Sequence, residues 1–253
     1  MGKKEIIQKS AEMKDCRVFD NLEASAVSDL IKRVTGSELY RRKFIIRKKQ
    51  ELKHGYDTFS LFDEGENIVI EANSGVSAAA GFNQYLKKIC NCFVGPLSEN
   101  LNLPENPPCV GKKIESTSLF LYRYFMNYCT YGYTTVFWKF EDYEKLLDWM
   151  MLSGINLVLN PVAHEVVWQK LLTELGYSER EIDNYLCGPA YMPWQWMGNM
   201  TRFGGDLPKW WYEDRLNLSN KINERLLSFG ASPILPGFCG LVPLDFEEKF
   251  AGS

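Results

Sequence analysis

The sequence predicts an α/β protein: an N-terminal α+β domain followed by the first part, about three β/α units, of a TIM (β/α)8 barrel. After residue 115, apolar strand segments alternate with amphipathic helical segments, which is typical of parallel strands joined by helical crossovers. No glycine-rich phosphate loop follows the first of these strands, as a nucleotide-binding sheet would require. Polar and aromatic residues instead follow all three strands, which favours a barrel whose site lies at the carboxyl ends of its strands.

The composition narrows the class of protein. The 253 residues are long enough for one large or two ordinary domains, and the net charge of −3 gives no reason to expect a nucleic acid or an anionic membrane as partner. No apolar run reaches the roughly 18 residues of a membrane span, and the first residues lack the apolar core of a signal peptide. With two His and scattered Cys, no metal-ligand spacing appears, so we expect no metal and no cofactor. The pairing of the seven thiols stays open.

The first part of the chain divides into a charged lead-in at 1–23 and an α+β domain at 24–94. The expected elements of this domain are a helix over 24–34 ended by Gly36, strands over 43–47, 58–63 and 67–72, and a small-residue helix over 74–88. Basic residues cluster between Arg41 and Lys53. A nucleic-acid surface is one interpretation, and an edge strand protected by Lys and Arg is the one that we favour.

Residues 95–114 are rich in Pro and Gly and are expected to form a linker, and residues 115–253 are expected to form the incomplete barrel. The periodicity predicts the following strands and helices: strand 119–123, helix 141–152, strand 155–159, helices 165–175 and 179–186, helix 211–229 and strand 232–235. An aromatic-rich loop follows the first strand, and a Trp-rich excursion over 187–211 precedes the last helix.

The predicted strand exits and the excursion carry side chains suited to a sugar, because amides and phenols bind hydroxyls and an indole packs on the apolar face of a sugar ring. The candidates are Asn127, Cys129 and Tyr133 after the first strand, His164 and Glu165 after the second, Phe238, Cys239 and Gly240 after the third, and Tyr191, Trp194, Trp196 and Asn199 in the excursion. The alternative is that these aromatic residues only pack one loop against another.

Three of these residues invite a catalytic interpretation. Glu165 beside His164 could act as a general acid, but an acidic residue is also favoured at the start of a helix. Cys129 as a nucleophile would need a base, and His164 is the one candidate. A glycosidase needs two carboxylates across the scissile bond, and this set offers one.

Several of these motifs together resemble the lysosomal α-N-acetylglucosaminidase family. They are Arg123-Tyr-Phe-Met-Asn-Tyr-Cys-Thr-Tyr-Gly-Tyr, Gly154-Ile-Asn-Leu, Glu165-Val-Val-Trp, Gly188-Pro-Ala-Tyr, Trp194-Gln-Trp-Met-Gly-Asn-Met and Pro233-Ile-Leu-Pro, with Asn73-Ser-Gly-Val-Ser-Ala-Ala-Ala-Gly similar to the end of the family's N-terminal domain. The resemblance covers roughly residues 24 to 250.

The resemblance implies a retaining glycoside hydrolase with two catalytic glutamates on a (β/α)8 barrel, which removes terminal α-linked N-acetylglucosamine from heparan sulfate in the lysosome. It implies that Asn127, Cys129, Tyr133 and Trp194 shape the sugar pocket, with Glu165 and His164 beside it. It also implies that the partner is a carbohydrate, and it allows a homo-oligomer of the full-length enzyme.

The sequence also departs from the family pattern. The family usually has Gln at the position of His164 and His at that of Leu241. Its catalytic glutamates are expected beyond Ser253, so none of the residues present is assigned as catalytic, and the isolated chain is expected to be an inactive N-terminal part. The alternative is a non-catalytic carbohydrate-binding or interaction protein derived from that family. The sequons at Asn199 and Asn217 leave glycosylation open.

Overall fold

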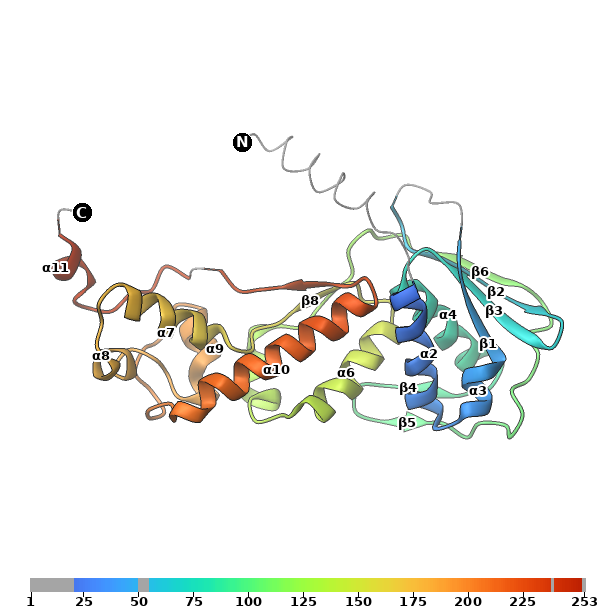
Figure 1. Ribbon diagram of the computed structural model, residues 1–253, viewed down its shortest axis with the longest axis horizontal. Coiled ribbons are helices and arrows are strands. Elements are labelled where there is room, and N and C mark those ends of the chain that lie inside the picture. Colours follow the sequence, from blue (N-terminus) through green and yellow to red (C-terminus); the bar gives the residue numbers. More distant parts are fainter. Residues whose placement is uncertain (1–20, 50–54, 238, 252–253) are drawn as a thin grey trace. The chain divides into compact units, whose positions relative to one another are not determined.

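A mixed four-stranded sheet forms the centre of the first part of the chain (Figure 1). The computed structural model describes residues 21–49, 55–237 and 239–251. The strands β1 (Phe44–Lys48), β2 (Thr58–Glu64), β3 (Asn67–Ala72) and β6 (Ile114–Thr117) lie in the order β1-β3-β2-β6. β2 and β3 pair antiparallel through a turn in which Gly65 has a φ of +61°, and β1 pairs with β3 in parallel. The first three strands confirm the prediction.

Three helices accompany this sheet: α2 (Asn21–Thr35), α3 (Glu38–Lys43) and α4 (Gly75–Lys88). α4 packs on β2 and β3, and α2 packs on α4 (Figure 1). A capping box explains where α4 begins, because the Ser74 side chain accepts from the Ser77 N–H while the Ser77 side chain binds the Ser74 backbone. α2 is described from Asn21 onward and covers the predicted start at residue 24. Of the predicted lead-in, residues 1–20 lie outside the described residues.

The prediction missed α3, which lies where only a basic run was noted. Ser37 caps this helix by accepting a hydrogen bond from the Tyr40 N–H. Two basic residues in and after α3 form salt bridges: Arg41 pairs with Asp29, and Arg47 pairs with both Glu64 and Glu71. β1 lies at the edge of the sheet, as the favoured interpretation of this run requires. Residues 50–54 of the run lie outside the described part.

A second sheet has the order β7-β8-β9, with β7 (Tyr124–Phe125), β8 (Leu157–Leu159) and β9 (Ser232–Ile234). β7 and β8 are parallel, as predicted. The predicted strand over 119–123 is wrong, because pairing starts only at Tyr124. Arg123 donates from its guanidinium to the Phe120 carbonyl at 2.8 Å, which bends this segment, and the Leu119 side chain is left 86% exposed.

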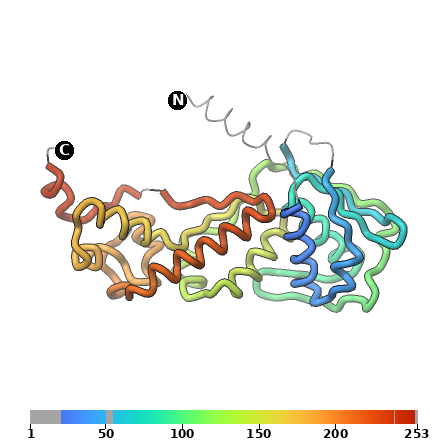
Figure 2. Tube along the Cα trace, viewed as in Figure 1, coloured from blue at the N-terminus to red at the C-terminus, as the bar shows by residue number. Residues whose placement is uncertain are grey.

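Four helices after β7 lie where the periodicity predicts them: α6 (Phe140–Leu152), α7 (His164–Glu174), α8 (Glu179–Asp183) and α10 (Lys209–Ser228). A further short helix, α11 (Phe246–Phe250), lies after β9. α10 runs beside α6, where Arg225 donates a 2.7 Å hydrogen bond to Glu144 (Figure 2). α8 ends at Asp183, three residues before the predicted end.

The predicted linker contains the short strand β5 (Glu99–Asn100), which pairs with β4 (Phe93–Val94).

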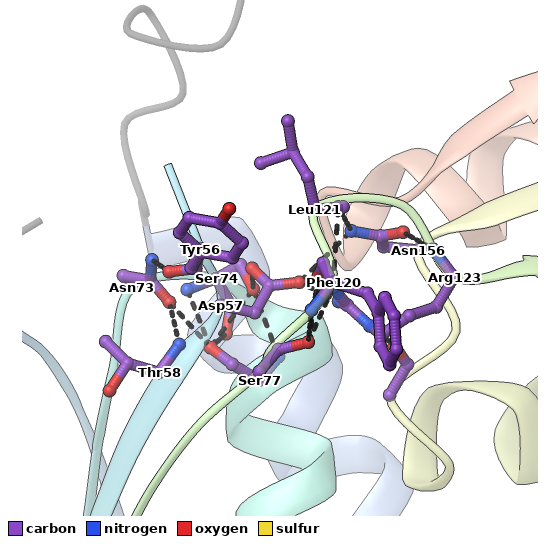
Figure 3. Close-up of polar contacts among 12 residues, drawn as sticks. Tyr56, Asp57, Thr58, Asn73, Ser74, Ser77, Phe120, Leu121, Arg123 and Asn156 are labelled. Atoms are coloured by element: carbon purple, nitrogen blue, oxygen red, sulfur yellow. Dashed lines mark hydrogen bonds and ion pairs between the residues drawn. The ribbon is translucent and has the colours of Figure 1, made fainter. Parts of the chain in front are cut away.

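The Asp57 carboxylate joins four segments of the chain (Figure 3). One oxygen accepts from the Ser74 hydroxyl at 2.9 Å, and the other accepts from Asn156 at 3.2 Å and from the Arg123 guanidinium. Asn156 in turn accepts the Arg123 N–H at 2.9 Å. Half-buried charges held in this way fix the chain where it enters β7 and β8.

Contacts between Cα atoms divide the chain into two compact units. The first contains the described residues up to Phe125 together with Glu144–Val158 and Glu224–Ser232. The second contains Met126–Tyr143, Leu159–Asn223 and the described residues from Pro233 onward. No helix within the described ranges combines the length and apolarity that crossing a membrane requires.

Candidate functional site

The segment after β7, predicted as an aromatic loop, consists of two short helical turns in the second unit: α5 (Tyr128–Thr130) and the π-helical turn η1 (Tyr131–Thr135). Asn127 caps the first turn, because its Oδ1 accepts from the Thr130 N–H at 2.9 Å and from the Thr130 hydroxyl at 3.0 Å. Asn127 is exposed, so its amide NH2 group is available to a ligand.

Tyr133 and Trp194 lie together, as the sugar-pocket prediction requires. Their ring centroids are 5.9 Å apart at 85°, an edge-to-face contact. Trp194 belongs to α9 (Met192–Trp196), which follows the 3-10 turn η2 (Pro189–Tyr191). Gly132 permits this approach, because a Cβ there would lie 2.7 Å from the Ala190 carbonyl oxygen. The Tyr133 side chain is 76% exposed, so the pair presents an accessible aromatic edge.

Gln195 fixes α9, and the sequence analysis did not single it out. It is fully buried between two tryptophans; its Oε1 accepts the Cys187 N–H at 2.8 Å and its Nε2 donates to the Tyr185 carbonyl at 2.9 Å. The amide therefore replaces the backbone pairing that this irregular segment lacks. A Gln between two Trp on a short helix is the only sequence signal for this role.

The chain enters α7 through Ala163, whose φ of +69° is unusual for a residue with a side chain. His164 follows and is buried, with its ring 4.5 Å from the Trp196 ring. Burial lowers the pKa of His164 to about 4, so the imidazole is neutral near pH 7. Among the residues that the structure describes, the His164 Nδ1 and the Trp196 Nε1 have no hydrogen-bond partner.

Glu165 has no exposed surface at all. Its Oε1 accepts a 2.7 Å hydrogen bond from the Trp211 indole, and its Oε2 has no partner in the described part of the chain. Burial raises the pKa of Glu165 to about 7; the hydrogen bond from its own backbone N–H, the Trp211 bond and the Arg215 charge oppose that rise. Burial and the Glu165 charge likewise raise the pKa of Tyr131, whose buried hydroxyl also has no partner within the described ranges.

The remaining candidate residues make no hydrogen bond or ring contact with His164 or Glu165 in the part of the chain that the structure describes. No hydrogen bond or ring contact joins Cys129 to His164 in the described residues, so geometry does not support a Cys–His nucleophile. Tyr191 packs its ring on Phe203, and Asn199 is exposed. Leu241 offers its carbonyl to the Tyr185 hydroxyl at 2.7 Å. Phe238 lies outside the described residues.

The site also contains residues that sequence reasoning missed, namely Tyr131, Trp211 and Arg215. Trp211 and Arg215 lie one helical turn apart on α10, a spacing that could have indicated a shared face. No group of three or more His, Cys, Asp or Glu side chains in the described ranges could hold a metal ion. The arrangement is suited to hydrogen bonding and aromatic packing around a small polar ligand.

Two family models match the chain. The tim-barrel domain of α-N-acetylglucosaminidase matches residues 123–253, just over half of the chain, and its N-terminal domain matches residues 25–109. The human α-N-acetylglucosaminidase is 35% identical over 230 residues, which is 90% of this chain and 31% of that protein. The chain thus spans about a third of the length of the curated relative that it matches.

Solved structures agree with the family models. A family 89 glycoside hydrolase from Clostridium perfringens, in complex with 2-acetamido-1,2-dideoxynojirmycin, is similar with a TM-score of 0.86 and 41% identity over 90% of this chain and 26% of that one. A variant of the Clostridium perfringens enzyme bound to its substrate GlcNAc-alpha-1,4-galactose gives a TM-score of 0.85, with the same identity and coverage. With both of its domain models matched in order along the sequence, this chain belongs to the α-N-acetylglucosaminidase family.

Proposed function

We propose that this chain carries part of the N-acetylglucosamine pocket of an α-N-acetylglucosaminidase that removes terminal α-linked N-acetylglucosamine from heparan sulfate in the lysosome. The observation that carries the proposal is the edge-to-face contact of the exposed Tyr133 with Trp194. The exposed Asn127 amide lies in the same turn segment as Tyr133, six residues earlier in the chain. The Clostridium perfringens relatives, bound to an N-acetylglucosamine analogue and to a GlcNAc disaccharide, support the same class of ligand.

In this proposal Asn127, Cys129, Tyr133 and Trp194 shape the pocket. The Asn127 amide donates to a sugar oxygen, and the edge of the Tyr133–Trp194 pair packs on the apolar face of the ring. Glu165 and His164 are both buried, and the His164 ring is neutral near pH 7. The departure from Gln to His at residue 164 therefore replaces a neutral polar group by another neutral one.

The match of the two family models, over residues 25–109 and 123–253, supports a two-domain architecture, for which we propose the following boundaries. Residues 24–94 form the N-terminal α+β domain, residues 95–114 the linker, and residues 115–253 about three β/α units of a (β/α)8 barrel. The parallel pair β7–β8 and the sheet order β7-β8-β9 support this arrangement.

The proposal assigns sugar binding to this chain and cleavage to residues outside it. Retaining glycosidases use two carboxyl groups about 5 Å apart, and Glu165 is the one carboxyl group among the candidate residues. We therefore place the two catalytic glutamates outside residues 1–253. The 253-residue chain would hold N-acetylglucosamine without hydrolysing its glycosides.

Calorimetry on the purified chain tests binding. N-acetylglucosamine should bind with a Kd of about 1 mM, as for a small ligand with few polar contacts. Tyr133→Ala and Trp194→Ala should weaken binding at least tenfold, while Tyr122→Ala, at a half-exposed tyrosine of the first unit, should leave it unchanged. Absence of heat with 20 mM sugar would refute the pocket, and hydrolysis of a nitrophenyl α-N-acetylglucosaminide would refute the placement of the glutamates.

A further inference from the structure

Glu165 is at the centre of a buried group of side chains that comes from three separate segments. Its carboxyl group is fully buried, so a ligand outside cannot reach it in this conformation. Its contact to Trp211 joins the first turn of α7 to the first half of α10. Tyr131, from the turn after β7, is also fully buried and interacts electrostatically with Glu165.

Arg215 connects the buried side chains around Glu165 to the backbone at the end of the turn after β7. Its NH1 donates to the Val136 carbonyl at 3.3 Å and to the Trp138 carbonyl at 3.1 Å. Its guanidinium lies over the Trp211 ring at 4.9 Å from the centroid and also pairs with Asp214. One face of α10 therefore holds both the Glu165 carboxyl group and the backbone that follows η1.

A hydrogen bond from α6 also holds the turn after β7. The Tyr143 hydroxyl donates to the Thr135 hydroxyl at 2.9 Å, and Thr135 is fully buried. Between Asn127 and Thr135, the candidates Asn127 and Tyr133 are exposed, while Tyr131 and Thr135 are buried. Tyr131 interacts with Glu165, and Thr135 is bonded to Tyr143. A buried polar atom without a hydrogen-bond partner costs about 1–3 kcal/mol of folding free energy. Glu165 Oε2 and the Tyr131 hydroxyl are two such atoms among the described residues, so packing alone does not account for these side chains.

We propose that Glu165 is a positioning residue: with Trp211, Arg215 and Tyr131 it sets the turn from Asn127 to Tyr133 in its sugar-binding conformation, and it does not itself contact the sugar. This inference rests on the proposed function for what the turn binds. It differs from the assignment of Glu165 as a substrate contact, because a fully buried carboxyl group acts on a ligand only through its neighbours.

The protonation state of Glu165 is consistent with this role. Because burial raises its pKa to about 7, the carboxyl group is protonated in acid and its Oε2 can then donate a hydrogen bond. Hydrogen bonds from its own backbone N–H and from the Trp211 indole favour the charged form, as does the Arg215 cation. The other titratable groups that interact with it are the phenols of Tyr131, Tyr143 and Tyr212, from three elements. No second carboxylate among the described residues acts on Glu165 to compete for the proton.

The test compares Glu165→Gln and Glu165→Ala by calorimetry with N-acetylglucosamine at pH 5.5 and pH 8.5. Gln keeps the acceptor for Trp211 and carries a permanent donor, so E165Q should bind within about threefold of the parent chain at both pH values. The parent chain should bind severalfold more weakly at pH 8.5, where Glu165 is charged. E165A should lose at least tenfold, and Glu174→Ala, an exposed acid on the same helix, serves as the matched control.

Two outcomes would overturn the inference. If folded E165Q loses binding as severely as E165A, the carboxylate itself serves the ligand. If E165A binds like the parent chain, the group has no positioning role. Should the parent chain not bind the sugar at all, the proposed function fails, and the role of Glu165 is decided by limited proteolysis. Cleavage between Asn127 and Thr135 should be faster in E165A and unchanged in E165Q and E174A; equal rates in all variants would refute the inference.

Discussion

The Trp211 indole donates a 2.7 Å hydrogen bond to Oε1 of Glu165, which links the start of α7 to the first half of α10 inside the second unit. Both side chains are buried, and neither was paired with the other by sequence pattern. Trp211→Phe keeps an aromatic ring but removes the donor. It should lower the free energy of unfolding by about 2 kcal/mol, because the buried carboxyl group then lacks its partner.

Urea denaturation measures this change. Trp210→Phe is the matched control, since the neighbouring Trp210 side chain is 63% exposed. Equal stabilities of the two variants would show that the bond contributes nothing.

The two adjacent groups at the start of α7 should have opposite effects on the pH dependence of stability. The pKa of Glu165 is raised to about 7, so folding takes up a proton and stability falls as pH rises from about 4.5 to 7. The pKa of His164 is lowered to about 4, so folding releases a proton and stability rises with pH from about 4 to 6.5. Each effect is on the order of 3 kcal/mol, so the two nearly cancel between pH 4.5 and 6.5.

Single substitutions separate these two effects. In His164→Gln, stability should fall as pH rises from 4.5 to 7. In Glu165→Gln, stability should rise from pH 4 to 6.5. Chemical denaturation of each variant at several pH values, compared with the parent chain, measures the slopes. Parallel profiles for the two variants would contradict the assignment.

Gly132 permits the approach of the turn after β7 to the segment that carries Trp194. Gly132→Ala would place a Cβ 2.7 Å from the Ala190 carbonyl oxygen, which backbone atoms can relieve only by moving apart. We expect a loss of about 1–3 kcal/mol in stability and a larger relative loss in N-acetylglucosamine binding, because the Tyr133–Trp194 contact is displaced.

Calorimetry and thermal unfolding of the G132A chain check this expectation. Gly237→Ala is the control, since no atom of the described residues beyond its chain neighbours lies within 4 Å of a Cβ at that position. Sugar affinity equal to that of the parent chain would show that the contact does not depend on this glycine.

Asp57 stabilises the region where the chain enters β7 and β8 (Figure 3). Asp57→Ala leaves the Arg123 side chain, 18% exposed, without its carboxylate partner, and should cost about 3 kcal/mol of unfolding free energy. Asp57→Asn keeps acceptor capacity and should cost less. Urea denaturation compares them with Glu66→Ala, an exposed acid in the β2–β3 turn. A cost below 1 kcal/mol for D57A would mean that the other bonds of Arg123 suffice.

Local sequence signals were enough for much of the fold. The spacing of apolar residues predicted α4, α6, α7 and α10 within a few residues, because a helix buries one stripe of its surface and the period of 3.6 records that stripe. In the structure, capping boxes at Ser74 and Ser178 fix the starts of α4 and α8. Apolar content alone failed over 119–123, where the side chain of Arg123 bends the segment through hydrogen bonds that composition does not encode.

The candidate site shows the same division. Apolar spacing identified the long helices, because that signal depends on residues a few positions apart, and the residue types that follow each strand could be read directly. The parallel pairing of β7 and β8 was inferred from the alternation of strands and helices along the chain. Three relationships emerged from the folded structure alone: Tyr133 meets Trp194, Gln195 fixes α9, and Glu165 is buried against Trp211 and Tyr131. Those contacts join residues as many as 61 positions apart, from Tyr133 to Trp194 (194 − 133), and depend on packing and desolvation, which no local pattern records.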